Sequence, residues 1–200
     1  MDNLKIEVDR FIIFLKSIER TFVGVPFDDC YSFKVEIVQN NEAEAIFKAM
    51  KSNAVIMLYN YVEAAVRKTM SDFYNKFNTS TCSYSEVILE LRKLWISSKV
   101  KDIKENTIVS DVFEMIENSI NQEFFISLDF EKDFSLSGNA DVRTIKEILY
   151  KHGVPFEESQ FSDYGGSLKS IKDMRNSLAH GNISFEENGK NLTVADIEKY

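Results

Sequence analysis

Apolar residues recur every three or four positions along most of this chain, which is the period of a helix with one buried face. The longest stripe predicts one helix over residues 41–77. Shorter stripes predict helices over 3–20, 84–98, 110–122, 141–152 and 167–181. The pattern therefore predicts an all-α fold, a helical bundle with one long central helix.

The connecting segments carry weaker signals. Residues 31–37 alternate as a strand does, but no partner strand is evident, so we expect this segment to be extended. Mixed signals predict a surface loop or short extended piece over 123–138. Residues 157–166 are expected to be a linker, and residues 186–191 a hydrophilic turn.

Several polar residues are suited to cap these helices. Ser110 or Asp111 would cap the helix over 110–122. Thr193 is a suitable N-cap for one more helix near the end of the sequence. That helix would reach Tyr200 after barely two turns, so we expect a downstream part of the chain.

Composition favours one soluble domain over residues 1–200, because 44% of the residues are hydrophobic and 28% are charged. No apolar run approaches the length of a membrane span, and the first residues are acidic where a secretion signal is basic. We therefore expect a cytoplasmic protein without a membrane partner.

Cysteine and histidine are too scarce for a metal site. Cys30 and Cys82 are far apart in sequence and the chain has only two histidines, so we expect no metal and no cofactor. Two reduced, largely buried thiols are the expected state of the cysteines. His152 precedes a glycine, and we expect it to be an exposed residue that caps a helix.

The net charge of −8 argues against a broad nucleic-acid-binding surface. A small basic region is nevertheless present near the end of the chain. The segment from residue 167 to residue 180 contains three basic residues, Lys169, Lys172 and Arg175, and only one acidic residue, Asp173. Any RNA contact is therefore expected to be confined to this region.

The region lies on a predicted amphipathic helix over residues 167–181, whose apolar residues recur at intervals of three and four. Ser167 is a plausible N-cap, preceded by a glycine-containing linker, and Gly181 suits the left-handed turn that ends a helix. At roughly 100° per residue, Arg175 lies about 50° from the centre of the apolar stripe and about 140° from His180. Asn176 lies between them.

Two interpretations of Arg175 and His180 are possible from the sequence, one functional and one structural. The last turn of a helix favours the imidazolium form of His180, and a protonated histidine beside an arginine suits phosphate transfer. Alternatively, the arginine covers the edge of the apolar stripe and the histidine hydrogen-bonds to the last helix carbonyls.

The stretch Arg175-Asn176-Ser177-Leu178-Ala179-His180 resembles the R-x4-6-H motif of HEPN domains, including the polar residue that these domains favour after the arginine. The RNxLAHG form resembles prokaryotic MAE-like and RiboL-PSP-type HEPN proteins. Two upstream stretches support the resemblance, residues 61–67 in the long helix and residues 137–139, which lead into a helix that ends at 152–154. The resemblance covers roughly residues 40 to 200.

The resemblance implies metal-independent cleavage of RNA, but not of DNA, by a homodimer with one composite site. His180 would be the general acid or base acting with the ribose 2′-hydroxyl. Arg175 would stabilise charge on the phosphate, and Asn176 would position His180 or the phosphate. Lys169 and Lys172 would support RNA binding. Ala179 is small enough to let two such helices approach closely.

Some HEPN domains use an acidic residue to orient the motif, and Glu63 can be interpreted in two ways. It either orients Arg175 or His180 from the long helix, or forms an exposed ion pair with Arg67 one turn later. Residues 181–183 contain no tyrosine, the residue adenylylated in some HEPN toxins, so that form of control has no obvious target.

The biological context implied is a bacterial toxin or phage-defence effector, with an antitoxin or defence-system partner protein. The alternative is a HEPN-like module without catalysis, used for dimerisation or for binding a partner or RNA. The negative charge favours the alternative, and the intact arginine, asparagine and histidine favour the enzyme.

Overall fold

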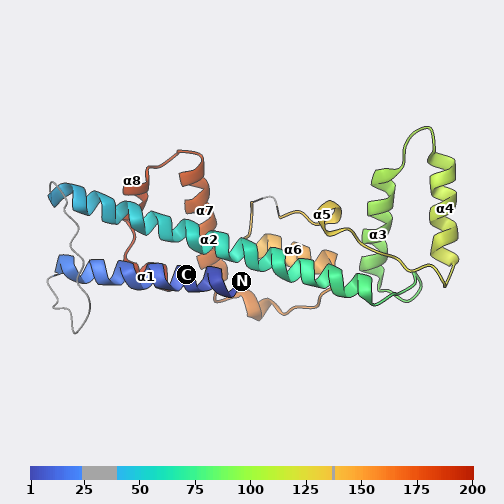
Figure 1. Ribbon diagram of the computed structural model, residues 1–200, viewed down its shortest axis with the longest axis horizontal. Coiled ribbons are helices and arrows are strands. Elements are labelled where there is room, and N and C mark those ends of the chain that lie inside the picture. The colour runs from blue at the N-terminus through green and yellow to red at the C-terminus, as the bar shows by residue number, and fades with distance from the viewer. Residues whose placement is uncertain (24–39, 137) are drawn as a thin grey trace. The chain divides into compact units, whose positions relative to one another are not determined.

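The computed structural model describes residues 1–23, 40–136 and 138–200. Within these ranges the chain is helical, with one isolated bridge between Ser83 and Phe125 and no named strand, which confirms the all-α prediction. Figure 1 labels the helices α1 to α8. In chain order the elements are α1 (Asp2–Val23), α2 (Asn40–Thr79), α3 (Leu89–Asp102), α4 (Ile108–Ile120), α5 (Phe130–Asp133), α6 (Val142–Lys151), the 3-10 helix η1 (Glu158–Phe161), α7 (Gly165–Ala179), α8 (Phe185–Lys190) and α9 (Val194–Glu198).

The extended segment predicted at residues 31–37 lies outside the described residues. Cys30 lies outside them as well. Cys82 is a half-buried free thiol. No helix in the described ranges is both long enough and apolar enough to cross a membrane.

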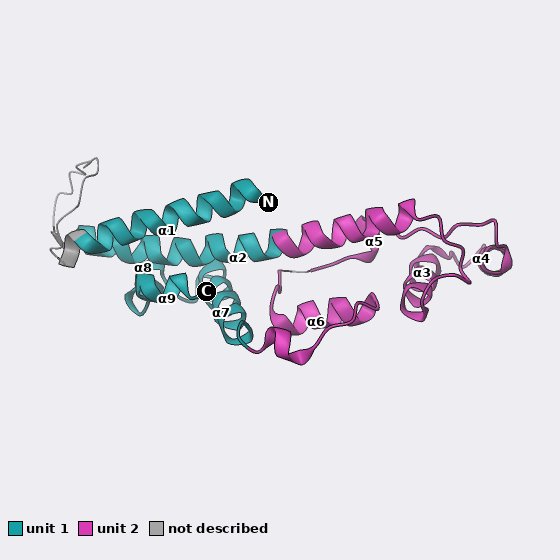
Figure 2. Ribbon diagram, turned by 90° about the horizontal axis from the view of Figure 1, so that it is seen from below, with its two compact units in different colours: residues 1–64, 163–200 teal, residues 65–162 magenta. Residues whose placement is uncertain are grey.

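The described residues form two compact units, shown in different colours in Figure 2. Unit 1 comprises residues 1–64 and 163–200, and unit 2 comprises residues 65–162. Helix α2 contributes its first part to unit 1 and its last part to unit 2. A single domain over residues 1–200 stays a prediction.

The core of unit 1 forms where the apolar stripe of α1 meets α2 and α9. Leu15 of α1 and Ile197 of α9 are fully buried, and Phe47 and Ala54 of α2 complete the contact. Thr193 caps α9 as predicted, because its hydroxyl accepts a hydrogen bond from the backbone N–H three residues later.

The hydrophilic turn predicted at residues 186–191 is wrong, because this segment is mostly the helix α8. Ser184 caps it by accepting the Glu187 backbone N–H at 3.1 Å. Its buried polar residue, Asn188, faces α2: the Asn188 amide donates to Ser52 Oγ at 3.0 Å, and Ser52 in turn donates to a backbone carbonyl at the start of α8. A Cβ on Gly189 would lie 1.8 Å from the Lys48 carbonyl oxygen, so only glycine permits this approach.

In unit 2, α3 buries Leu91, Leu94 and Trp95, all of them on its predicted apolar side. The helix begins at Leu89 rather than at residue 84. The preceding residues instead form a turn, in which the Glu86 carboxylate accepts hydrogen bonds from both the backbone N–H and the hydroxyl of Ser83.

The caps predicted for α4 are wrong, since Thr107 occupies the N-cap position and donates its hydroxyl to Asp111 at 2.6 Å. The loop predicted over 123–138 is confirmed for most of its described residues, but it contains the short helix α5. Asp129 caps α5 by accepting two backbone N–H groups, a local arrangement that four residues are too few to reveal by periodicity. The predicted linker over 157–166 likewise contains η1.

His152 caps α6 as predicted, but it is 2% exposed, so the expectation of an exposed residue is wrong. Its Nδ1 lies 2.7 Å from the Ile148 carbonyl oxygen and must donate the proton, so its Nε2 accepts from the Tyr74 hydroxyl at 2.9 Å. Burial lowers the pKa of His152 and raises the pKa of Tyr74, which keeps this pair neutral.

Mild acid is therefore expected to destabilise unit 2. The unfolded chain binds a proton at His152 more readily than the folded protein, so the free energy of unfolding falls as the pH drops through the ordinary histidine pKa of about 6.5. Urea unfolding, followed by the fluorescence of Trp95, measures this at about pH 7.5 and about pH 5.5, above the carboxylate range. Trp95 is the only tryptophan of the chain and is buried in unit 2.

The two histidines supply matched variants for this measurement. His152→Gln is expected to remove most of the pH dependence, whereas His180→Gln is expected to retain it, because His180 lies exposed at the end of α7. An equal loss of stability on acidification in wild type and His152→Gln would contradict the assignment.

Candidate functional site

The predicted motif helix is α7, which lies in unit 1 and buries Ile171 and Leu178. It begins at Gly165 rather than after Ser167, so the N-cap predicted at Ser167 is wrong, and the last two residues of the predicted linker, Gly165 and Gly166, belong to the helix. The Leu168 backbone N–H donates to the Tyr164 carbonyl oxygen at 3.0 Å, which places the two glycines in the first helical turn.

The end of α7 is closed by backbone hydrogen bonds around Gly181. This residue has φ = +67°, the left-handed conformation predicted for it. The Asn182 N–H donates to the Ser177 carbonyl oxygen at 2.9 Å, and the Gly181 N–H donates to the Leu178 carbonyl oxygen at 3.1 Å. Because backbone groups bind these carbonyls, the imidazole of His180 is not needed to cap the helix. It lies exposed at the helix end.

Arg175 is half-buried and held on two sides. Its guanidinium lies over the ring of Tyr59 in α2, with Cζ 4.7 Å from the ring centroid. Its Nη1 donates to the amide oxygen of Asn176 at 3.0 Å. Tyr59 is only 1% exposed, so the ring that supports the guanidinium is itself fixed in the core of unit 1.

Asn176 therefore meets Arg175 through its side chain and His180 only through its backbone, whose carbonyl oxygen accepts the His180 N–H at 3.0 Å. The sequence predicted that this side chain would position His180 or a phosphate. In this structure its amide oxygen accepts from the arginine, and the predicted role stays a prediction.

Tyr59 was not singled out from the sequence. Glu63 lies one turn beyond it on α2, so the two share the helix face that Arg175 meets. An aromatic residue four positions before the predicted carboxylate was the available signal. Glu63 is half-buried, and its role in orienting the motif stays a prediction.

The remaining predicted residues lie along the same helix. Lys169 is exposed. The Lys172 side chain is 18% exposed, with its Nζ 4.0 Å from the carboxylate of Asp173. Ala179 is exposed beside His180, which leaves the end of α7 accessible to another molecule.

The structure thus brings the side chains of Arg175 and Asn176 together, and it joins His180 to them only through the backbone of Asn176. No hydrogen bond within the described ranges joins the imidazole to the guanidinium, in agreement with the angle of about 140° between their positions on one helix. Arg175 has five N–H donors, and one of them meets Asn176. The arrangement can therefore offer an oriented cation to an anion, with an accessible imidazole on the same helix.

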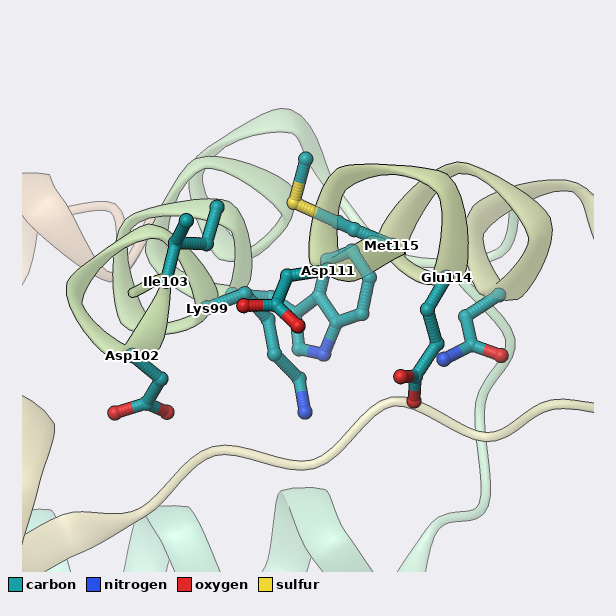
Figure 3. Close-up of a pocket in the computed structure, with 8 residues that line it drawn as sticks. Lys99, Asp102, Ile103, Asp111, Glu114 and Met115 are labelled. Carbon is teal, nitrogen blue, oxygen red and sulfur yellow. The ribbon is translucent and has the colours of Figure 1, made fainter. Parts of the chain in front are cut away.

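The pocket shown in Figure 3 lies elsewhere, between α3 and α4 of unit 2, and has a volume of about 190 Å³. Trp95 and Lys99 line it from α3, and Asp111 and Glu114 from α4. No motif residue contributes to it. No group of three or more metal-ligating side chains is found among the residues that the structure describes.

An all-α chain with R-x4-H at the end of a late helix fits a HEPN-type domain. A family model described as HEPN_MAE_28990-like HEPN matches residues 1–200. The chain belongs to this family. No curated protein and no solved structure matches it.

Proposed function

We propose that this protein is a metal-independent endoribonuclease of the HEPN type. The observation that carries the proposal is the pairing of a fixed Arg175 with an accessible His180 on one helix. The ring of Tyr59 and the amide of Asn176 orient the guanidinium in advance, which lowers the cost of binding a phosphate in a defined geometry. HEPN domains in general are associated with ribonuclease activity and often dimerise.

In the proposed reaction His180 accepts the proton of a ribose 2′-hydroxyl as the oxygen attacks the neighbouring phosphorus. The O2′–P bond forms, the P–O5′ bond breaks, and the leaving 5′-oxygen takes a proton from water. The products are a 2′,3′-cyclic phosphate and a 5′-hydroxyl. The guanidinium of Arg175 stabilises the charge that develops on the phosphate oxygens. DNA lacks the nucleophile and is not cut.

A homodimer supplies the site in this proposal. One helix directs Arg175 and His180 apart, so two copies of α7 around a two-fold axis are needed to converge on one phosphate. The exposed Ala179 supports a close approach of the two helices. Glu63, Lys169 and Lys172 are proposed to orient the motif and to bind the RNA backbone.

The proposed context is the cytoplasm of a bacterium, where the enzyme acts as a toxin or phage-defence effector with an antitoxin or defence-system partner. The second candidate is a HEPN module without catalysis, used for dimerisation or for binding a partner or RNA. The net charge of −8 favours this candidate, because it opposes general binding to RNA.

The test is an RNA cleavage assay with purified protein in EDTA. Single-stranded RNA is expected to be cut to products with 2′,3′-cyclic phosphate ends, while DNA of the same sequence stays intact. RNA with 2′-O-methyl groups is the matched control and is expected to resist. Activity that EDTA removes, or that cuts DNA, would rule out the proposed chemistry. No cleavage under any condition would favour the second candidate.

A further inference from the structure

Helix α4 of unit 2 exposes its largest apolar side chains. Val109 is 80% exposed, Phe113 63%, Ile116 50% and Ile120 68%. None of the thirteen residues of α4 is buried. The four residues follow one another at spacings of four, three and four, which places them in a single stripe. We call them the α4 stripe.

The α4 stripe faces away from α3, the helix that precedes it in unit 2. At about 100° per residue, the α4 residues that line the pocket with α3 are centred about 180° from the stripe. These residues are Asp111, Glu114, Met115 and Asn118, all of them polar apart from the methionine. Figure 3 labels the first three of them at the pocket. A helix normally turns its apolar side inward, so α4 has the orientation of a helix that packs on something else.

A hollow adjoins one end of the stripe. It has a volume of about 590 Å³, and Val109 and Phe113 line it together with Glu105 and Ile108. The stripe spans three turns, a length of about 16 Å, which matches one face of a short helix. The shape therefore fits an elongated apolar face better than a small compact ligand.

The charges around the stripe restrict what can cover it. Residues 105–123 contain five acidic residues and no lysine or arginine. Glu117 borders the stripe about 70° from its centre, and Glu114 follows about 60° further round. A second copy of α4 would bring like charges together, and RNA or an anionic membrane would be repelled. A partner helix with basic flanks is attracted.

We propose that the α4 stripe is a docking surface for a basic amphipathic helix of another protein. The apolar residues of that helix pack on Val109, Phe113, Ile116 and Ile120, and its lysines or arginines meet the acidic flank that contains Glu114 and Glu117. This surface is separate from the α7 motif and does not depend on RNA cleavage.

The experiment measures binding of two synthetic peptides to the full chain by fluorescence anisotropy. Both peptides are about 18 residues long with leucines in one stripe, and they differ only in carrying lysine or glutamate at the flanking positions. The lysine peptide is expected to bind at least about tenfold more tightly, with a preference that falls as salt rises.

Variants locate the binding. Phe113→Asp is expected to weaken the lysine peptide at least about tenfold, because it places a charge in the centre of the apolar contact. Ile13→Asp is the matched control, since Ile13 on α1 is also 63% exposed. It is expected to leave the affinity unchanged. The double variant Glu114→Lys with Glu117→Lys is expected to shift the preference toward the glutamate peptide.

Three outcomes would overturn the proposal. In the first, the two peptides bind with equal affinity, or Phe113→Asp and Ile13→Asp change the affinity for the lysine peptide equally. In the second, light scattering finds a dimer that Phe113→Asp splits, so that a second copy occupies the stripe. A dimer that only Ala179→Trp splits belongs to the proposed α7 interface instead. In the third, phosphatidylcholine vesicles bind wild type but not Phe113→Asp.

Discussion

His180→Ala is expected to lower the rate of RNA cleavage by about 10²–10⁴-fold, the usual contribution of a general acid or base. His180 is exposed, and backbone hydrogen bonds around Gly181 close the helix end without the imidazole. The variant should therefore keep the helical circular dichroism signal and the melting temperature of wild type. Initial rates on a fluorescent RNA in EDTA measure the effect. Wild-type rates in the variant would contradict a catalytic role.

Arg175 requires variants that respect its contact with Tyr59. Alanine would uncover a buried ring, so a loss of activity could reflect a loss of packing. Arg175→Met keeps the ring covered without charge and is expected to be as inactive as His180→Ala. Arg175→Lys keeps the charge but lacks the planar fork, so we expect partial activity. Arg143→Met, on the exposed surface of α6, is the control and should cut normally.

Mixing the two inactive chains distinguishes a composite site, built from both chains, from two independent sites within single chains. A dimer of one Arg175→Met chain and one His180→Ala chain retains one intact copy of each residue. Refolding the chains together is therefore expected to restore part of the activity that each lacks alone. If light scattering shows that the fully active protein is a monomer, the composite site is contradicted.

Gly189→Ala is expected to destabilise the protein by about 1–3 kcal/mol, the usual cost of overpacking a close contact. The new Cβ would lie 1.8 Å from the Lys48 carbonyl oxygen, and a backbone group of α2 cannot move aside as a flexible side chain can. The shift of α8 would also disturb the hydrogen bond between Asn188 and Ser52. Urea unfolding measures the change in the free energy of unfolding.

Gly166→Ala is the matched control, because both glycines lie inside helices. No atom lies within 4 Å of a Cβ built on Gly166, so alanine is expected to stabilise α7 by about 0.5–1 kcal/mol through its higher helix propensity. The two glycine variants should therefore change stability in opposite directions. A Gly189→Ala protein as stable as wild type would contradict the close packing of α8 on α2.

Periodicity predicted the helices whose apolar stripes are long. Helices α1, α2 and α6 end within three residues of their predicted bounds, because each repeats its buried face over several turns. Periodicity failed for α5 and α8, which span 4 and 6 residues. A helix of one or two turns is too short to show a period. Its stability comes from caps and from the surface against which it packs.

The candidate site likewise contains residues that local sequence identifies and a residue that only tertiary contacts bring to it. Residue types and spacing were enough to select Arg175, Asn176 and His180, since a motif on one helix depends on local sequence. Tyr59 could not be selected, because it lies 116 positions before Arg175 and meets it only after α7 has packed on α2. The same packing directs the Asn176 amide to the arginine.

Local sequence was therefore sufficient for the all-α class, the motif helix and the glycine that ends it, because short-range backbone geometry and helical period decide these features. Contacts between residues distant in sequence decided the rest. They bury His152 against Tyr74, and they hold polar α8 against α2 through Ser52 and Gly189. They also leave the α4 stripe exposed. Burial is a property of what surrounds a side chain, and the order of residues along one helix does not contain that information.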